Sequence, residues 1–248
     1  PTVEIADVIV ANAAGATRPA MLTVRRAAAS LAVVPLLSGR LEIARIVFDG
    51  MDLLVERDAA GRGNWQLEDG ARSAPSAAAG NADGGGAGVV IDVARVRVRD
   101  GLVRLGTGVA GAPATIVVDS LDVVADAERL QVEAELARDG VALELALTTA
   151  PLAAVRAAGP LPIEVTAGIA GARLTVAGRI GELRALQGVD LALAASGPDL
   201  GRLGPLLGVT LPAGAFDVQA RLVGGRERLE LADLVAVTPL GEVAGDAA

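Results

Sequence analysis

The sequence contains no histidine, cysteine, tyrosine or lysine. Without histidine and cysteine the chain cannot build a Ser/His or Cys/His nucleophile, a disulfide or a zinc site of the usual kind. Without lysine it cannot form a Schiff base. Only carboxylates, hydroxyl groups and arginines remain for acid and base chemistry. We therefore expect a protein that is not an enzyme and that holds neither a metal ion nor a cofactor.

Aromatic side chains and positive charge are also scarce. Aromatic residues make up 1% of the chain, and the net charge is −8. A nucleic-acid surface needs clustered positive charge and stacking rings, so no nucleic-acid partner is expected. A carboxylate-based hydrolase remains an alternative, with Glu133 and Glu135, or Asp119 and Asp122, as its acids. A solvated outer face is the more common role for such pairs, and a glycosidase would also want aromatic platforms around its acids.

Long apolar runs are absent. No segment has the roughly 20 consecutive apolar residues that cross a bilayer as a helix. The longest candidate, residues 27–37, is interrupted by Ser30 and Pro35, and no signal peptide with a basic start and a cleavage site is present. Because a strand-like pattern, TVEIADVIVA, follows directly after Pro1, we expect the sequence to be a fragment whose native N-terminus is missing.

The dominant pattern in the sequence is the alternation of aliphatic residues with other residues. Hydrophobic residues are 52% of the 248 and the mean hydropathy is +0.50, although a GC-rich coding sequence gives a similar composition. Between residues 129 and 138 every second residue is apolar, as in a strand with one apolar and one solvated face. Residues 141–148 repeat this pattern after Asp139-Gly140, a strong hairpin signal. Similar runs occupy residues 40–56, 95–105, 114–124, 163–169, 173–180, 189–195, 216–222 and 228–237.

Three segments depart from the strand pattern. Residues 151–158 begin with proline and are rich in alanine, which favours a short helix, and residues 199–207 begin with Asp199, which suits a helix N-cap. Residues 69–88 are rich in Gly, Ala and Ser and have nothing to bury, which is typical of a flexible loop. The expected organisation is therefore N-terminal strands in 1–68, a loop in 69–88 and a continuation of the same sheet in 89–248.

These patterns predict a mainly β protein: a long, twisted antiparallel sheet curled into an open groove or half-barrel, with one or two short helices. A closed sandwich needs bulky side chains to fill about 10 Å between its sheets, and this chain has few. The apolar face of an open groove would instead hold acyl chains. The candidates for its lining are Leu130, Val132, Leu136, Leu143, Leu145, Leu147, Leu174, Val176, Phe216 and Val218.

The most specific motif lies in residues 35–68, PLLSGRLEIARIVFDGMDLLVERDAAGRGNWQLE. A leucine pair and Gly39 precede a strand, and a turn with Gly61, Asn64 and Trp65 follows it. The turn lacks the lysine and the Ser/Thr of a phosphate-binding P-loop, which favours a structural role for these residues. The arrangement resembles the N-terminal signature of the AsmA family.

A second segment, residues 191–243, resembles the strand, short helix, turn and two-strand unit of AsmA-like repeats. The residues that carry this resemblance include Gly197, Asp199 and Gly241. In the family such a glycine opens a further strand, so we expect the C-terminus to be truncated too.

The resemblance implies a function. The AsmA family looks like a prokaryotic branch of the bridge-like lipid transfer proteins, whose β-groove modules form a trough. Its members are anchored in the inner membrane by an N-terminal helix and extend through the periplasm, where they are implicated in phospholipid traffic to the outer membrane. The implied partners are phospholipid, the inner membrane through a missing helix, and an outer-membrane or periplasmic protein. The alternative is a structural or assembly factor for outer-membrane proteins, with a filled core and no trough.

Three arginines form a stripe on one predicted strand. Arg95, Arg97 and Arg99 alternate with valines, so their guanidinium groups share one face. One interpretation is contact with anionic lipid headgroups. The other is pairing with acids of a neighbouring strand, such as Asp119 or Asp122, and the negative net charge favours it.

Overall fold

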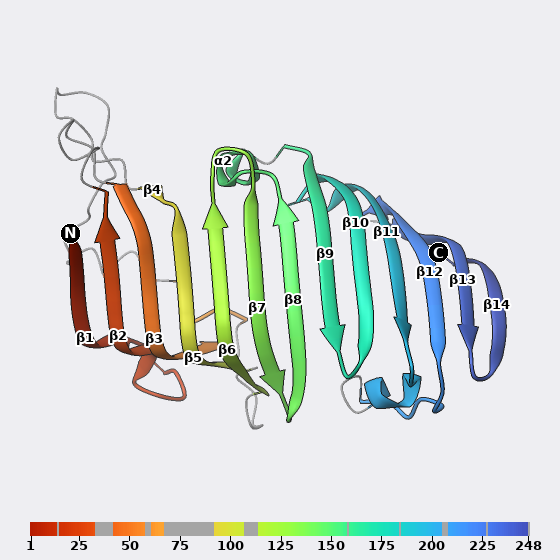
Figure 1. The fold of residues 1–248 in the computed structure, drawn as a ribbon, viewed down its shortest axis with the longest axis horizontal. Helices are drawn as coiled ribbons and strands as arrows, with labels where there is room; N and C mark the ends of the chain where they lie inside the picture. The colour runs from red at the N-terminus through yellow and green to blue at the C-terminus, as the bar shows by residue number, and fades with distance from the viewer. Residues whose placement is uncertain are drawn as a thin grey trace. The chain divides into compact units, whose positions relative to one another are not determined.

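The computed structural model describes residues 1–13, 15–32, 42–57, 61–66, 92–106, 114–157, 159–183, 185–204, 208–226 and 228–247. The described chain is mainly β-strand and divides into two compact units, Pro1–Asp122 and Val123–Ala248. Each unit is built on strands that lie side by side (Figure 1). The mainly β class expected from the alternating sequence is confirmed.

Unit 1, residues 1–122, holds the strands β1 to β6. Their bounds are β1 Thr2–Ala11, β2 Ala20–Leu31, β3 Glu42–Glu56, β4 Asp92–Val93, β5 Arg95–Gly106 and β6 Ala114–Ala125, the last of which continues past the unit boundary. β2 pairs antiparallel with both β1 and β3. β1 has a strand neighbour on one side only, so the described sheet of this unit is open.

Two pairs in unit 1 differ from the antiparallel sheet that the sequence predicts. β3 pairs in parallel with β5, and the short β4 also pairs in parallel with β3. Antiparallel neighbours can follow a tight turn, whereas parallel neighbours need a connection of about a dozen residues or more. The chain between Glu56 and Arg95 is long enough for that return, and the expected loop at 69–88 lies within it, outside the described residues.

Unit 2, residues 123–248, is an antiparallel meander in chain order. Its strands are β7 Leu130–Arg138, β8 Val141–Thr149, β9 Leu161–Ile169, β10 Ala172–Glu182, β11 Gln187–Gly197, β12 Phe216–Gly225, β13 Arg228–Thr238 and β14 Gly241–Ala247. The predicted hairpin between β7 and β8 forms, with Asp139 at φ 52° and Gly140 at φ 78°. Positive φ at both central residues matches the right-handed twist of the flanking strands. β14 has a described strand neighbour on one side only, so this sheet is open as well.

Two short helical segments interrupt the meander. The helix α2, Leu152–Arg156, follows Pro151 between β8 and β9, as the sequence predicts. The second segment includes a 3-10 turn, η1, Leu200–Leu203, between β11 and β12. It lies within the helix expected at 199–207, of which residues 205–207 fall outside the described residues. Asp199 still serves as its N-cap, because its carboxylate accepts the N–H of Gly201 at 3.0 Å.

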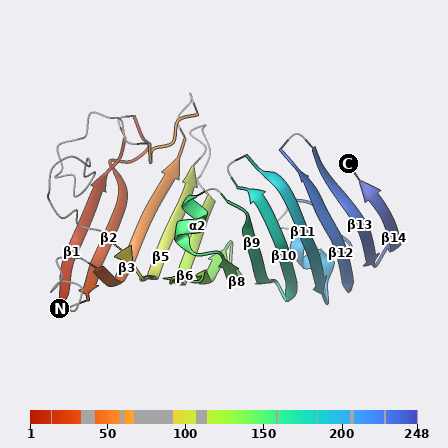
Figure 2. The ribbon, with the colours of Figure 1, turned by 90° about the horizontal axis from the view of Figure 1, so that it is seen from above.

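Buried apolar side chains are few among the described residues. They are Val24, Leu54, Val98 and Val118 in unit 1, and Ala134, Leu161, Ala172, Val189, Leu191 and Phe216 in unit 2. No second sheet packs on either unit in the described part of the chain (Figure 2). In unit 2 the apolar face therefore has little cover from the described chain.

Candidate functional site

The pairing register of unit 2 decides which side chains share a face. In an antiparallel pair, residues directly opposite each other point to the same side of the sheet. Between β7 and β8, Val132 lies opposite Leu147, and Leu136 lies opposite Leu143. The predicted lining residues of these two strands therefore occupy one face.

The same face continues through the next strands. On β9, Val165 lies opposite Leu147 on one side and opposite Val176 on the other. Val176 in turn lies opposite Leu193 of β11. At this position along the strands, the four neighbouring strands β8 to β11 each present an aliphatic side chain to the same side of the sheet.

The apolar row extends to β12. Ala195 lies opposite Leu174 of β10 and opposite Val218 of β12, and Gly197 lies opposite Phe216. All ten candidates thus share one face of unit 2, which we call the apolar face. It also includes residues that the candidate list omitted although the alternation covered their strands: Ile163, Val165, Leu193 and Leu222.

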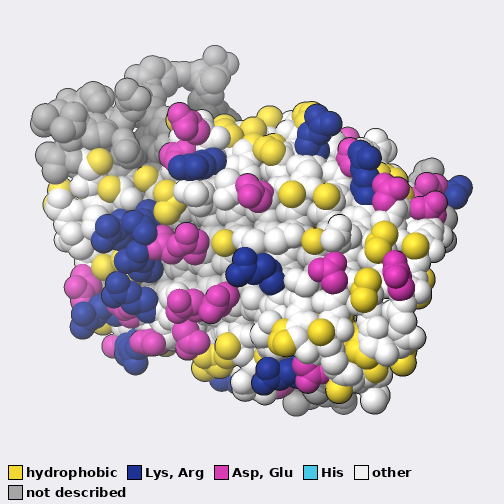
Figure 3. Space-filling view, turned by 45° about the vertical axis from the view of Figure 1, so that its right-hand side comes forward, with side chains coloured by type: hydrophobic (Ala, Val, Ile, Leu, Met, Phe, Trp, Pro, Cys, Tyr) yellow, Lys and Arg dark blue, Asp and Glu magenta, His cyan; other side chains and the backbone are white. Residues whose placement is uncertain are grey.

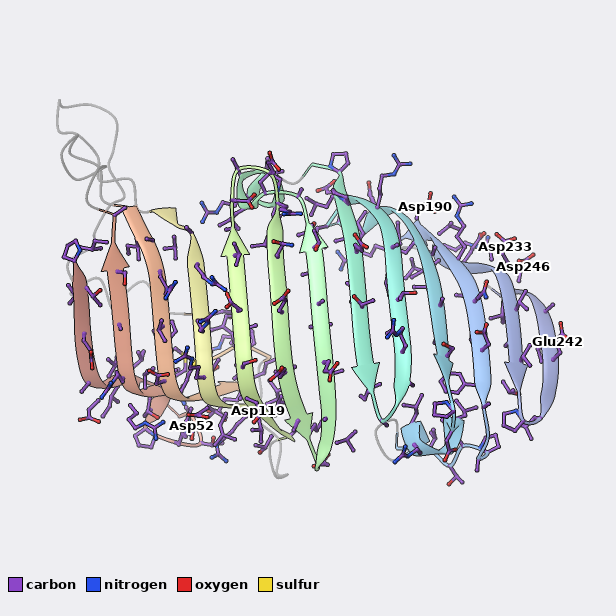
Figure 4. All side chains as sticks on the ribbon, viewed as in Figure 1. Asp52, Asp119, Asp190, Asp233, Glu242 and Asp246 are labelled. Carbon is purple, nitrogen blue, oxygen red and sulfur yellow. The ribbon has the colours of Figure 1, made fainter. Side chains whose placement is uncertain are left out.

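The opposite face of unit 2 is polar. Its residues include Gln131, Glu133, Glu135, Glu144, Glu164, Arg173, Arg179, Asp190, Asp217 and Arg221. Figure 3 shows one side of the molecule, on which arginine and acidic side chains lie next to one another, and Figure 4 shows the side chains along the strands, with Asp190 labelled. Arg221 forms an ion pair of 2.7 Å with Asp190 on this face.

The carboxylates considered for a hydrolase do not gather into a pocket. Glu133 and Glu135 are exposed on the polar face, where Glu135 lies opposite Glu144. Asp122 is held by two arginines in unit 1, and Asp119 makes no ion pair with another described residue. Among the described residues no group of three or more acids could hold a metal ion.

The middle of the apolar face is accessible to solvent. Leu143, Leu145 and Leu147 on β8 are half-buried, and Leu174 of β10 is 37% exposed. A leucine in a closed core would be almost completely covered. The remaining lining candidates are half-buried too, except one: Leu130, Val132, Leu136, Val176 and Val218 are half-buried, whereas Phe216 is buried.

The buried residues of unit 2 lie mostly near the ends of the strands. Leu161 and Thr149 flank α2, and the Thr149 hydroxyl donates to the carbonyl of Pro162 at 2.6 Å. At the opposite end, the Phe216 ring occupies the space over Gly197, where a Cβ would lie 2.8 Å from Cε1 of the ring. The segments at the strand ends thus leave the centre of the apolar face uncovered by the described chain.

In unit 1 the arginine stripe is paired with an acid. Arg95 binds Asp122 through two hydrogen bonds of 2.7 and 2.6 Å, and Arg97 binds the same carboxylate. The hydrogen bonds from Arg95, followed by those from Arg97, lower the pKa of Asp122 from 3.8 to about 2 although burial opposes this change. The ion-pairing interpretation of the stripe therefore holds for Arg95 and Arg97, with Asp122 as the shared partner.

This ion pair predicts an acid-sensitive unit 1. Because the folded pKa of Asp122 lies below its ordinary value, its stabilisation is complete above about pH 4 and is lost as the pH falls towards about 2. We expect Asp122→Asn to lower the free energy of unfolding by about 2 kcal/mol at pH 7. Denaturant titrations followed by Trp65 fluorescence measure this. Below about pH 2 the variant and the parent should converge, and an equal gap at all pH values would contradict the assignment.

The turn with the family-like motif closes a partly buried polar cluster at the end of β3. The Asn64 side chain accepts the N–H of Glu56 at 3.1 Å and donates to the carbonyl of Leu54 at 2.9 Å and to the side chain of Asn12 at 3.0 Å. The Glu56 carboxylate accepts the Thr17 hydroxyl at 2.6 Å and the Thr17 N–H at 2.9 Å. We call Asn12, Thr17, Glu56 and Asn64 the polar clamp.

The glycines and the tryptophan of this turn have local packing roles. Gly61 has φ 79°, which glycine adopts without strain. The Trp65 ring folds over Gly63, where a Cβ would clash with the ring, and the Arg57 guanidinium stacks on the ring at 5.0 Å from its centroid. Trp65 itself is 43% exposed. Gly39 and the leucine pair before it lie outside the described residues.

The motif residues of unit 2 also take structural positions. Asp199 accepts the N–H of Gly214 at 3.2 Å in addition to its N-cap bond, which ties η1 to the segment before β12. Gly241 begins β14 with φ 129°, and its carbonyl accepts the Thr238 hydroxyl. The polar clamp was not predicted, because Asn12 and Thr17 lie in a short connection with no pattern of its own.

Comparison with known proteins identifies the family to which this chain belongs. No helix in the described part of the chain has the length and apolar character that a membrane crossing requires. No curated protein and no solved structure matches the chain. The family model described as AsmA family matches residues 1–133. Since this match covers more than half of the 248 residues, the chain belongs to the AsmA family.

Proposed function

We propose that this chain binds the acyl chains of phospholipids on the apolar face of unit 2 and conducts them along it. The observation that carries the proposal is the register, which places an unbroken set of aliphatic side chains from β7 to β12 on one half-exposed face. An exposed apolar surface of this extent in a folded protein marks a binding site.

The chemistry of the face fits hydrocarbon and no other part of a lipid. The β8 residues Leu143, Leu145 and Leu147 and their neighbours offer no charge and no unpaired donor in the centre of the face. Each methylene that leaves water for such a surface contributes roughly 0.8 kcal/mol. The lipid headgroups remain in water, because no charged residue lies in the centre of this face to bind them.

Membership of the family supports a place for this activity in the cell. The proposed protein is a non-enzymatic segment in the periplasm, anchored to the inner membrane by an N-terminal helix and serving phospholipid supply to the outer membrane. Its proposed partners are phospholipid, the inner membrane and a protein of the periplasm or the outer membrane.

One observation favours the alternative of an assembly factor that acts through protein contacts. Strand β1 has one free edge in the described structure, and its Val3, Ile5 and Ile9 are 51%, 57% and 70% exposed. A long edge strand with exposed β-branched residues is suited to pairing with a strand of another protein. Such pairing would leave the apolar face of unit 2 unused.

Native mass spectrometry distinguishes the two functions. We expect the chain, purified without detergent at neutral pH, to carry masses of bound phospholipid. Release of these adducts by collisional activation, and phospholipid in an organic extract, identify the ligand class. Lipid-free protein in this experiment would contradict lipid binding and leave the assembly role.

A further inference from the structure

Three strands of unit 1 each contain one residue with a left-handed backbone conformation. Asp7 in β1 has φ 52°, Gly50 in β3 has φ 66° and Asp100 in β5 has φ 50°. The registers on either side place Asp7 opposite Arg25, Arg25 opposite Gly50, and Gly50 beside Asp100. These four residues therefore form one row across β1, β2, β3 and β5, which we call the bend row.

The sequence around the bend row has an apolar spacing that a regular strand does not use. The apolar residues that flank the row are three positions apart, as Ile5 and Val8 or Phe48 and Met51 are, with two residues between them. In a regular strand, side chains three positions apart point to opposite faces. The strands keep their register across the row, so no inserted residue corrects the alternation.

The structure nevertheless brings both sides of the row onto one face. A Cβ on Gly101 would lie 3.1 Å from Cγ1 of Val98, 3.2 Å from Cβ of Val118 and 3.7 Å from Cε of Met51. Val98 precedes the row in its strand and Met51 follows it. A left-handed residue between them reverses the alternation, and the apolar side chains before and after the row meet on the same face.

Three of the four buried apolar side chains described in unit 1 lie along this row. Val24 is 2% exposed and adjoins Arg25, Val98 is 3% exposed and precedes Asp100 by two residues, and Val118 is 4% exposed. No second sheet covers them in the described part of the chain. A bend buries the side chains on its inner side against one another.

The side chains of the bend row contribute less to stability than its backbone conformation does. Arg25 lies across Gly50, where a Cβ would come within 2.9 Å of its guanidinium carbon, and it reaches Asp100 at 3.8 Å. The two charged side chains are 67% and 79% exposed, and exposed pairs of this kind contribute little to stability. Aspartate and glycine are the residue types that tolerate the left-handed region.

We propose that the bend row folds unit 1: its left-handed residues turn the single sheet back on itself, so that the apolar side chains before and after the row form one face with a shared core. The role belongs to backbone conformation and does not depend on lipid binding.

Strand β13 of unit 2 also contains a left-handed residue, but there the register with β12 and with β14 shifts. In β13, Asp233 has φ 52° between Leu231 and Leu234, again three positions apart. The Asp233 N–H donates to the Asp246 carboxylate at 2.9 Å in place of a ladder bond. Because the register shifts at Asp233, as at a β-bulge, this site differs from the bend row, across which the strands keep their register.

Three substitutions of Asp100, each made in the whole chain, distinguish the effect of backbone conformation from the effect of charge. Asp100→Val disfavours the left-handed region, because a β-branched side chain is strained there. Asp100→Asn keeps the tolerance and removes the charge, and Asp100→Gly removes both strain and charge. We expect Asp100→Val to lower the thermal midpoint of unit 1 by roughly 5 °C. Asp100→Asn should leave the midpoint within about 2 °C, and Asp100→Gly should leave it unchanged or raise it. Trp65 fluorescence reports unit 1, since it is the single tryptophan.

Arg99→Val is the matched control, because it places the same side chain one residue earlier, where φ is not left-handed. We expect no loss of midpoint there. Equal losses for Asp100→Val, Asn and Gly would assign the position to ion pairing and overturn the proposal. An unchanged midpoint for Asp100→Val would overturn it as well.

Discussion

Replacing both Leu143 and Leu145 with aspartate should remove bound phospholipid from the purified chain. Both leucines lie on β8 in the half-exposed centre of the apolar face, opposite Leu136 and Ala134. A carboxylate against hydrocarbon costs on the order of 2–3 kcal/mol, and each 1.4 kcal/mol is about tenfold in affinity. The two substitutions together should lower the affinity for acyl chains by more than about a hundredfold.

The control uses the other face of the same strand. Ala142 and Ala146 alternate with the two leucines and are exposed on the polar face. Ala142→Asp with Ala146→Asp adds the same two charges to β8 without touching the apolar face. Native mass spectrometry should find phospholipid on this control and none on the leucine variant, while circular dichroism shows the same strand content in both. Phospholipid retained equally by both variants would place the acyl chains elsewhere.

The alternation of apolar residues was enough to predict the apolar face of unit 2. Its strands follow one another in hairpins, and a hairpin such as Asp139-Gly140 fixes the register of the strands it joins. Once Leu136 lies opposite Leu143, every second residue of both strands falls on the same side. The exposure of that face was a weaker inference, because half-burial of Leu145 depends on what covers the sheet and the sequence does not state it.

Unit 1 was less predictable because its pairing is not local. The parallel pair of β3 and β5 follows a long connection, and no turn signal announces it. Asp122 could be named as a partner of the arginine stripe, but its shared use by Arg95 and Arg97 depends on register between strands. The aspartates of the bend row sit inside strand patterns and look like irregularities there. That these residues form one row is apparent only once the pairing registers of β1, β3 and β5 are known.

The motif turn posed a different difficulty. Gly61, Asn64 and Trp65 were assigned a structural role from their residue types, yet the partners of Asn64 could not be named. Glu56 ends a strand in the sequence and would be taken for a solvated residue, but it is 6% exposed. Its burial follows from contacts with Asn12 and Thr17, about forty residues earlier in the chain.

Asn64→Ala should be the most destabilising single substitution in the motif turn. Asn64 is 6% exposed and makes three hydrogen bonds, to the N–H of Glu56, the carbonyl of Leu54 and the side chain of Asn12. Alanine leaves these groups unpaired where water has little access, and each unpaired buried group costs about 1–3 kcal/mol. The free energy of unfolding of unit 1 should therefore fall by about 3–5 kcal/mol, measured by denaturant titration with Trp65 fluorescence.

Gln66→Ala supplies the comparison within the same turn. Gln66 is exposed and its backbone N–H, which the substitution keeps, donates to Gly63. We expect a change within about 0.5 kcal/mol for this variant, as for other exposed positions. Asn64→Asp keeps the acceptor for the Glu56 N–H but loses both donors and adds a carboxylate beside Glu56, so it should be at least as destabilising as alanine at neutral pH. If Asn64→Ala instead behaves like Gln66→Ala, the polar clamp does not hold the turn, and Arg57 with Trp65 must do so.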